Sequence, residues 1–303
     1  MDSLFKVDLE KMTINISSRD HTGNKNTIIS LDQKPDNEFS LINQNKKISR
    51  RSIKLLFNRT EKSLLKAIDY IITNDYQKAE KILCKIKKND KRFPECCYLL
   101  SLLKGDYFYK TSLLNNLFND LNGYGEFFNR YSLEIELIIP LNEKLCIILN
   151  NSKEGIAILL GLHYYVNNDP EKAEMILNNV RKDDTPLVGL LLGEIYLSTG
   201  QYDKTIQLLQ NTNSNQIISL YSSLIVGKAF REMGLLKTSI NILRKTRRAA
   251  EQFSLSLHLE GRYQLALSLE KSNKMHLAFR EYEKILALNY EYRDIKNLIE
   301  DLR

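Results

Sequence analysis

Tryptophan is absent from this chain of 303 residues, and glycine (12 residues) and proline (5 residues) are scarce. β-Sandwiches and β-barrels need turns rich in glycine and proline, so the composition disfavours both. Apolar residues make up 43% of the chain and charged residues 27%, which allows a core and excludes global disorder. The length suits one elongated domain or two compact ones, and the composition favours helices.

The sequence also lacks C-x-x-C motifs and apolar runs long enough to span a membrane. The four cysteines, Cys84, Cys96, Cys97 and Cys146, form no C-x-x-C pair, and two adjacent cysteines have poor geometry for a disulfide. The start of the chain does not resemble a signal peptide, and the apolar runs are far shorter than the ~20 residues that span a bilayer. We therefore expect a cytoplasmic protein in a reducing compartment.

Basic residues outnumber acidic residues by 44 to 37, which gives a formal net charge of +7. Such a surplus permits contact with nucleic acid or an anionic membrane surface, but the Asn-, Lys- and Ile-rich composition is also typical of AT-rich genomes. Neither basic cluster has interleaved aromatic residues that would stack on bases, apart from nearby Phe57, which favours a solvated face. The clusters are Lys46, Lys47, Arg50, Arg51 and Lys54, and Arg244, Lys245, Arg247 and Arg248.

The N-terminal region, residues 1–57, differs from the rest of the chain. Residues 12–17 alternate between polar and apolar, and residues 26–31 form a second β-prone run, so residues 18–25 could be the loop of a hairpin. A lone hairpin is marginally stable in water. We expect a small hairpin or a partly flexible arm that ends in the first basic cluster.

From about residue 60 one spacing of side chains recurs five times. A small residue is followed by an aromatic residue or leucine after three positions, by a second small residue after twelve, and by a large residue four positions later. Two antiparallel helices approach closely only where small side chains face each other, so this spacing predicts helix pairs. The five sets are Ala67, Tyr70, Ala79 and Leu83; Gly161, Tyr164, Ala173 and Leu177; Gly193, Tyr196, Thr205 and Leu209; Gly227, Phe230, Ser239 and Leu243; and Ala266, Leu269, Ala278 and Tyr282.

These units resemble tetratricopeptide repeats (TPRs) of the bacterial type. Residues 75–80 (DYQKAE), 169–174 (DPEKAE) and 200–205 (GQYDKT) are similar to the family's turn and second helix, and residues 160–164 and 192–196 (LGxxY) are similar to its first helix. The resemblance implies an all-α, right-handed solenoid of about seven helix pairs.

The resemblance also divides the chain. It implies a solenoid over residues 58–303, clearest in 154–290 and closed by a capping helix in 291–303. The stretch 94–153 would hold two degenerate pairs, near 95–120 and 126–150. A wider step between the last two units implies a longer second helix through residues 247–253.

In the family, the first helices line a concave groove that binds a partner. Among the corresponding positions only Lys228 and Arg231 suit the clamp with which some members hold a peptide carboxylate, so we expect an amphipathic helix or an extended apolar segment of another protein. Alternatively, these positions contact the chain's own N-terminal arm or a neighbouring superhelical turn. They are Leu64, Ile68, Ile71, Ile158, Leu162, Tyr165, Leu190, Glu194, Leu197, Leu224, Lys228, Arg231, Tyr263, Leu267 and Glu270.

Catalytic motifs are missing: there is no phosphate-binding glycine loop and no G-x-S-x-G. The four histidines lack metal-ligand spacing, and Glu134 and Glu136 would lie on different faces of a helix. We therefore expect a non-catalytic protein-interaction scaffold without metal or cofactor. The alternatives are a repeat module that binds RNA or an anionic surface, and an accessory subunit of a bacterial secretion or surface-appendage assembly; the oligomeric state stays open.

Overall fold

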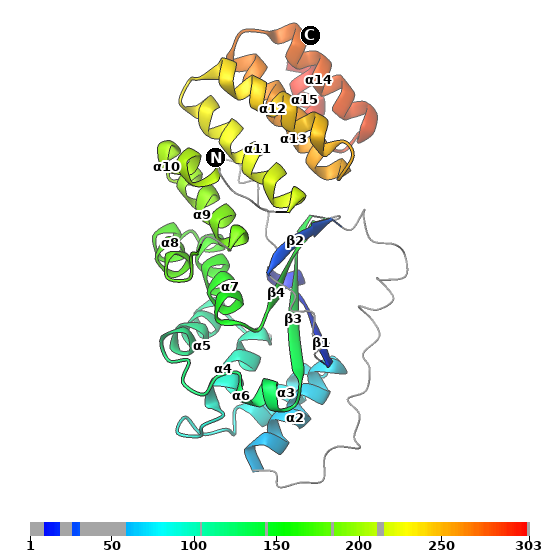
Figure 1. Ribbon diagram of the computed structural model, residues 1–303. Coiled ribbons are helices and arrows are strands. Elements are labelled where there is room, and N and C mark those ends of the chain that lie inside the picture. Colours follow the sequence, from blue (N-terminus) through cyan, green and yellow to red (C-terminus); the bar gives the residue numbers. More distant parts are fainter. Residues whose placement is uncertain are drawn as a thin grey trace.

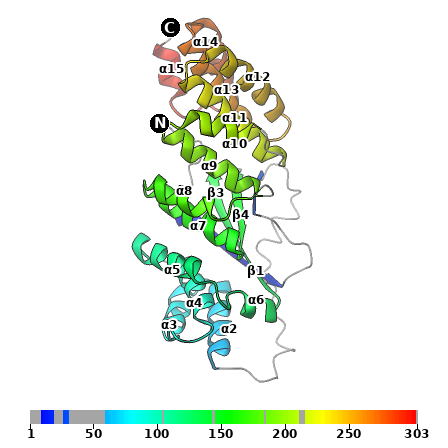
Figure 2. The same cartoon turned by 60° about the vertical axis from the view of Figure 1, so that its left-hand side comes forward.

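The computed structural model describes residues 9–18, 26–30, 59–103, 105–142, 145–182, 185–210 and 215–301. The predicted helical solenoid is confirmed, but the chain is not all-α: a four-stranded sheet accompanies six helix pairs in the described residues, where about seven pairs were expected. Helix pairs follow one another from α2 at one end to α15 at the other, which makes the array elongated, and a small sheet lies along one side of it (Figures 1 and 2). No helix in these ranges is long and apolar enough to cross a membrane.

Six antiparallel helix pairs build the solenoid in the described part of the chain. A short final helix, α15 (Ile295–Asp301), packs on the last pair and buries Ile295 and Ile299, as expected of a cap. The pairs are α2 (Arg59–Ile72) with α3 (Tyr76–Leu83), α4 (Phe93–Leu102) with α5 (Tyr107–Asn119), α7 (Lys153–Val166) with α8 (Pro170–Asn178), α9 (Pro186–Ser198) with α10 (Tyr202–Leu209), α11 (Gln216–Glu232) with α12 (Leu236–Ala250), and α13 (Leu255–Lys271) with α14 (Met275–Leu288).

The small residues of the recurring spacing hold each pair together. All ten are buried, and the glycines face the leucines that the spacing matches to them. A Cβ atom at Gly193 would lie 2.5 Å from Cδ1 of Leu209, and one at Gly227 would lie 2.6 Å from Leu243. At 15 residues, α12 is longer than the 8-residue α3 and α10, as the wider repeat step predicts, but it ends at Ala250 and not at residue 253.

The turn inside each pair is fixed by local polar contacts. Asp169 caps α8, since its carboxylate accepts a hydrogen bond from the backbone N–H of Lys172. The Lys172 ammonium also lies 2.7 Å from that carboxylate and 5.5 Å from the centre of the Tyr164 ring. Asp75 and Lys78 repeat the arrangement at α3. Residues 75–80 and 169–174, which resemble each other in sequence, are therefore capped helix starts.

A four-stranded antiparallel sheet interrupts the solenoid. Its strands are β1 (Thr13–Ser18), β2 (Thr27–Ser30), β3 (Leu133–Asn142) and β4 (Leu145–Asn150), in the order β1-β3-β4-β2. The 3-10 helix η1 (Leu9–Lys11) precedes β1. The predicted N-terminal strands exist, but the predicted hairpin between them is wrong, because the β3–β4 hairpin separates them.

The predicted helix pair near 126–150 is also wrong. Only the short α6 (Glu126–Arg130) is helical there, and β3 and β4 follow it. Along β3 every second residue from Leu133 to Leu141 is buried, which is the period of a strand packed on one face. Glu134 and Glu136 consequently share the other face, where the Asn15 side chain donates a hydrogen bond of 3.2 Å to Glu136.

Candidate functional site

Most of the predicted groove is closed. Twelve of the fifteen predicted lining residues are buried, and only Tyr165, Leu267 and Glu270 are partly exposed. The buried set comprises Leu64, Ile68, Ile71, Ile158, Leu162, Leu190, Glu194, Leu197, Leu224, Lys228, Arg231 and Tyr263. The positions taken from the family resemblance therefore face the interior of this chain.

The sheet accounts for part of this burial. It lies on the side of the first helices, where β4 contacts α7 and β2 contacts α11, while α8 and α10 lie on the far side (Figure 1). Asn26 fastens the start of β2 at this place: its amide donates to Glu154 (2.9 Å), and its carbonyl oxygen accepts from the backbone N–H of Asn150 (2.9 Å). Strand β2 contacts α11, and the Asn215 side chain at the start of that helix donates a hydrogen bond of 2.7 Å to Thr27. That the predicted positions of α11 contact the N-terminal arm stays a prediction.

The C-terminal part of the concave side holds a polar network instead of an open groove. Glu260 of α13 lies at its centre and accepts hydrogen bonds from Gln264 (2.8 Å), Tyr292 (2.7 Å) and Arg293 (2.7 Å). Arg231 of α11 donates to the Gln264 side chain at 2.8 Å. The network therefore ties α11, α13 and the start of the cap together.

Lys228 belongs to the same region. Burial lowers the pKa of its ammonium, while Glu194 and Glu260 oppose that shift and Arg231 adds to it. Charges of both signs thus lie within range of one another across α9, α11 and α13. A buried charge that loses its partners is costly, so these groups favour the arrangement of the repeats that keeps them together.

The residues of the second basic cluster, 244–248, differ in their surroundings. Arg247 forms an ion pair with Glu281 of α14 (3.2 Å), and Arg262 binds the same carboxylate at 2.6 Å. Lys245 and Arg248 are exposed, and Arg244 is half-buried. The first cluster, Lys46, Lys47, Arg50, Arg51 and Lys54, lies outside the described residues.

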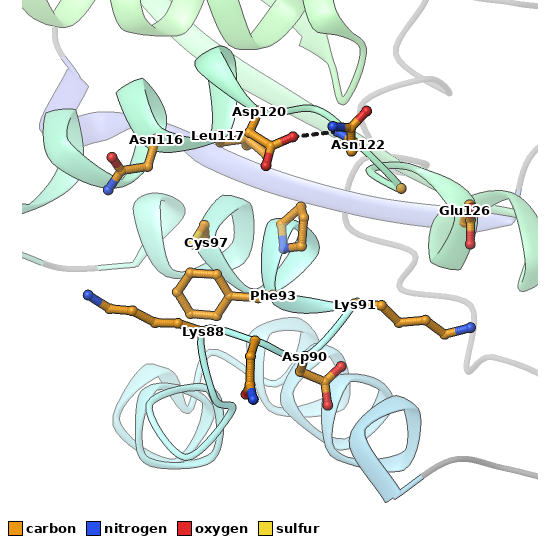
Figure 3. A pocket seen from close by; sticks show the side chains of 13 residues that line it. Lys88, Asp90, Lys91, Phe93, Cys97, Asn116, Leu117, Asp120, Asn122 and Glu126 are labelled. Atoms are coloured by element: carbon orange, nitrogen blue, oxygen red, sulfur yellow. Dashed lines mark hydrogen bonds between the residues drawn. The ribbon is translucent and has the colours of Figure 1, made fainter.

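A pocket of about 470 Å³ opens between the first turn of α4 and the end of α5 (Figure 3). Phe93, Pro94, Cys97 and Leu117 supply its apolar floor, and lysine, asparagine and acidic side chains supply its rim. None of these residues was predicted as a site. The run of lysines from residue 85 to 91 is visible in the sequence, but the floor joins two helices whose packing the sequence does not specify.

Arg92, beside the pocket, is completely buried. Its guanidinium binds Glu61 of α2 (3.0 Å) and Glu126 of α6 (3.0 Å), with Glu95 at 3.7 Å. Burial raises the pKa of Glu95, whereas hydrogen bonds from Tyr131 and Arg92 outweigh burial and lower that of Glu61. The walls of the pocket are thus anchored by a charged network that joins three helices.

The described residues contain no group of three or more His, Cys, Asp or Glu side chains that could hold a metal ion. His163 is buried in α7 beside Tyr107, with ring centres 6.4 Å apart, and His258 accepts a hydrogen bond from Arg262 (2.8 Å). These two histidines have packing partners within the fold.

Comparisons of the structure with known proteins identify the repeat type. The N-terminal domain of the EccA1 ATPase from the ESX-1 secretion system of Mycobacterium tuberculosis matches 80% of this chain and 89% of its own length, with a TM-score of 0.58 and 11% identity. A chain of the APC/C hetero-tetramer Cut9–Hcn1 matches 88% of this chain and 46% of its own, with a TM-score of 0.50 and 15% identity. The fold is a TPR-like solenoid.

Weaker structural matches and the sequence comparisons do not narrow the function further. The type IV pilus biogenesis factor PilW matches 80% of the chain with a TM-score of 0.47 and 12% identity. No protein-family model matches the sequence, and no curated protein matches it significantly. At these identities the similarity concerns the fold alone.

Proposed function

We propose that this chain is a non-catalytic scaffold that binds a segment of a partner protein. The observation that carries the proposal is a TPR-like solenoid whose concave side is only partly covered by its own sheet. Leu267 and Glu270 of α13 and Tyr165 of α7 stay accessible on that side. An apolar segment or amphipathic helix would pack on these residues, because they combine large side chains with one charge.

The test is affinity capture with the full chain at 50 and 300 mM salt, using Leu267→Asp and Tyr165→Ala as groove variants. Met175→Asp is the matched control, because Met175 is 58% exposed on α8, a second helix of its pair. Leu162→Asp is unsuitable, since Leu162 is 2% exposed and a buried charge would unfold the chain.

A partner protein retained at 300 mM salt by the wild type and the control, and lost from the groove variants, supports the proposal. Capture that persists in both groove variants contradicts it. Nucleic acid that is bound at 50 mM and released at 300 mM would favour the RNA-binding alternative, because phosphate contacts weaken steeply with salt.

We further propose a cytoplasmic place of action. The four cysteines are free, with Cys84 exposed and the other three buried, which suits a reducing compartment. The likeness to a domain of a secretion-system ATPase concerns the fold, so a role in secretion or in a surface appendage stays an alternative.

A further inference from the structure

The pocket beside α4 has the build of a binding site for one large apolar side chain. Figure 3 shows the Phe93 ring in its middle, below Cys97 and Leu117. Phe93 is half-buried, whereas Leu117 and Cys97 are almost fully buried, so the floor is firm and apolar. A volume of about 470 Å³ exceeds one side chain and leaves room for the backbone that carries it.

The rim offers hydrogen bonds that suit a peptide backbone. Asn89, Asn116 and Asn122 are exposed there, and their carboxamides make no hydrogen bond with another described residue. A carboxamide has donors and an acceptor, which match the alternating C=O and N–H groups of an extended chain. Three carboxamides around an apolar floor therefore favour a polypeptide over a purely apolar ligand.

The segment between α3 and α4, which forms one side of the pocket, is rich in lysine. Lys85, Lys87, Lys88 and Lys91 are exposed and form no ion pair with any described residue. Lys88 and Lys91 extend toward opposite ends of the pocket (Figure 3). Burial raises the pKa of the Cys97 thiol to about 11, and the Lys88 ammonium opposes that shift, so this charge acts close to the floor.

Three carboxylates also line the pocket: Asp90 lies between the two lysines, and Asp120 and Glu126 lie across from them (Figure 3). Glu126 binds Arg92 at 3.0 Å, and both carboxylate oxygens of Asp90 accept hydrogen bonds, from Thr60 and from the backbone of Arg92. Asp120 accepts only the backbone N–H of Asn122, at 3.1 Å, among the hydrogen bonds of the described residues. A hydrogen bond from a hydroxyl or a backbone N–H leaves the charge of a carboxylate in place, so Asp90 and Asp120 both oppose an acidic ligand.

We infer that this pocket binds an acidic segment of a partner protein, in which a large apolar residue is flanked on both sides by Asp or Glu. The apolar side chain packs on Phe93 and Leu117, and the flanking carboxylates lie at Lys88 and Lys91. Nucleic acid fits less well, because one half-buried ring cannot stack successive bases. The inference rests on the proposed scaffold function and names the chemistry of one partner segment.

The probe is the fluorescein-labelled hexapeptide EELLEE, with QQLLQQ and EEGGEE as matched peptides, measured by fluorescence anisotropy at 50 mM salt. We expect EELLEE to bind at least tenfold more tightly than either matched peptide. Equal binding of EELLEE and QQLLQQ, or of EELLEE and EEGGEE, overturns the inference. A ten-residue oligouridine that binds more tightly than EELLEE also overturns it, in favour of nucleic acid.

Variants locate the site on the full chain, each checked by its melting temperature. Phe93→Ala should weaken EELLEE at least fivefold, whereas Phe108→Ala, at a side chain 79% exposed at the other end of α5, should leave it unchanged. The double variant Lys88→Glu and Lys91→Glu should abolish binding, and the equally charged double variant Lys245→Glu and Arg248→Glu on α12 should not. Asp120→Asn should strengthen binding about threefold by removing an opposing charge.

The peptide-binding experiment and the partner-capture experiment test the two proposals independently. Peptide binding that is lost in the control variants, or kept in Phe93→Ala and in the lysine double variant, overturns the pocket assignment. Capture of a partner through Leu267 and Tyr165 is measured with different variants on other repeats, so either proposal can fail while the other holds.

Discussion

Gly189 and Gly193 lie one turn apart on α9 and meet different surroundings. A Cβ at Gly189 would have no neighbour within 4 Å, whereas one at Gly193 would lie 2.5 Å from Leu209. The same substitution therefore has opposite consequences at the two positions. In a helix, alanine is favoured over glycine by ~0.5–1 kcal/mol when nothing stands in its way.

We expect Gly193→Ala to lower the free energy of unfolding by ~1–3 kcal/mol, because the added methyl forces Leu209 and α10 outward. Gly189→Ala should raise it by up to ~1 kcal/mol. Urea unfolding of both variants measures the difference. Equal shifts of the same sign would mean that the close contact between α9 and α10 does not constrain the pair.

His163 gives the chain a defined sensitivity to acid. Burial, with a smaller contribution from Lys110, lowers its pKa from 6.5 to about 4. Below pH ~6.5 the unfolded chain binds this proton and the folded chain does not, so stability should fall as the pH drops from ~6.5 to ~4. The loss should reach on the order of 3 kcal/mol.

His163→Leu should flatten stability over that pH range, as measured by urea unfolding at several pH values. His276→Leu, at an exposed position of α14, is the control and should keep the wild-type slope. A slope that His163→Leu leaves unchanged would assign the acid sensitivity to another group.

At the scale of elements, the helix pairs could be predicted because their determinants are local. Small residues, caps such as Asp169 and turn residues recur within each unit, and all of them lie where the spacing requires. The sheet could not be predicted in the same way. Strand β3 shows its period in Leu133, Ile135 and Leu137, but its partner β1 comes from a distant part of the chain, and that pairing is decided by tertiary packing.

The ion network around Arg92 joins α2, α4 and α6, and its removal should loosen all three. Arg92→Met leaves the carboxylate of Glu95 buried without its cation and leaves Glu61 with Arg130 alone, which should lower the free energy of unfolding by ~3–5 kcal/mol.

Arg130→Met is the matched control for this prediction. Arg130 binds the same Glu61 at 2.8 Å, but its side chain is 51% exposed, so its loss should cost less than ~1 kcal/mol. Chemical denaturation measures the free energy of unfolding of both variants. A similar decrease in the two would show that the burial of Arg92 adds no stability to the contact between α2, α4 and α6.

For the whole molecule, the sheet decides which surfaces a partner can reach. The family resemblance located the helix pairs outside residues 126–150, but it could not show that β2 contacts α11 or that Glu260 and Arg231 join a polar network. The lysine run beside the pocket was visible in the sequence. The floor of Phe93 and Leu117 was not, because it depends on how α4 packs on α5.

A substitution at Ile28 can test whether strand β2 shields the apolar face of the first helices from solvent. Ile28 is fully buried on β2, opposite Ile147, and Ile28→Asp should detach this strand from β4 and α11. We expect stronger fluorescence of an apolar-binding dye together with unchanged helical circular dichroism, because the helix pairs make their contacts locally.

Thr13→Asp, on the exposed side of β1, should change neither signal and serves as the control. An Ile28→Asp variant that binds no more dye than wild type would show that β2 does not shield the apolar face of the first helices.

The strand order has a consequence for synthesis of the chain. β1 ends at residue 18 and its partner β3 begins at residue 133, so roughly 115 residues must be added before the two can pair. At the usual pace of translation this takes about 6–23 s. During that interval the first strand has no ladder to join, and exposed β-prone segments are prone to pair between chains. Factors that hold nascent chains should therefore raise the yield of this protein most when translation is slowed between β2 and β3.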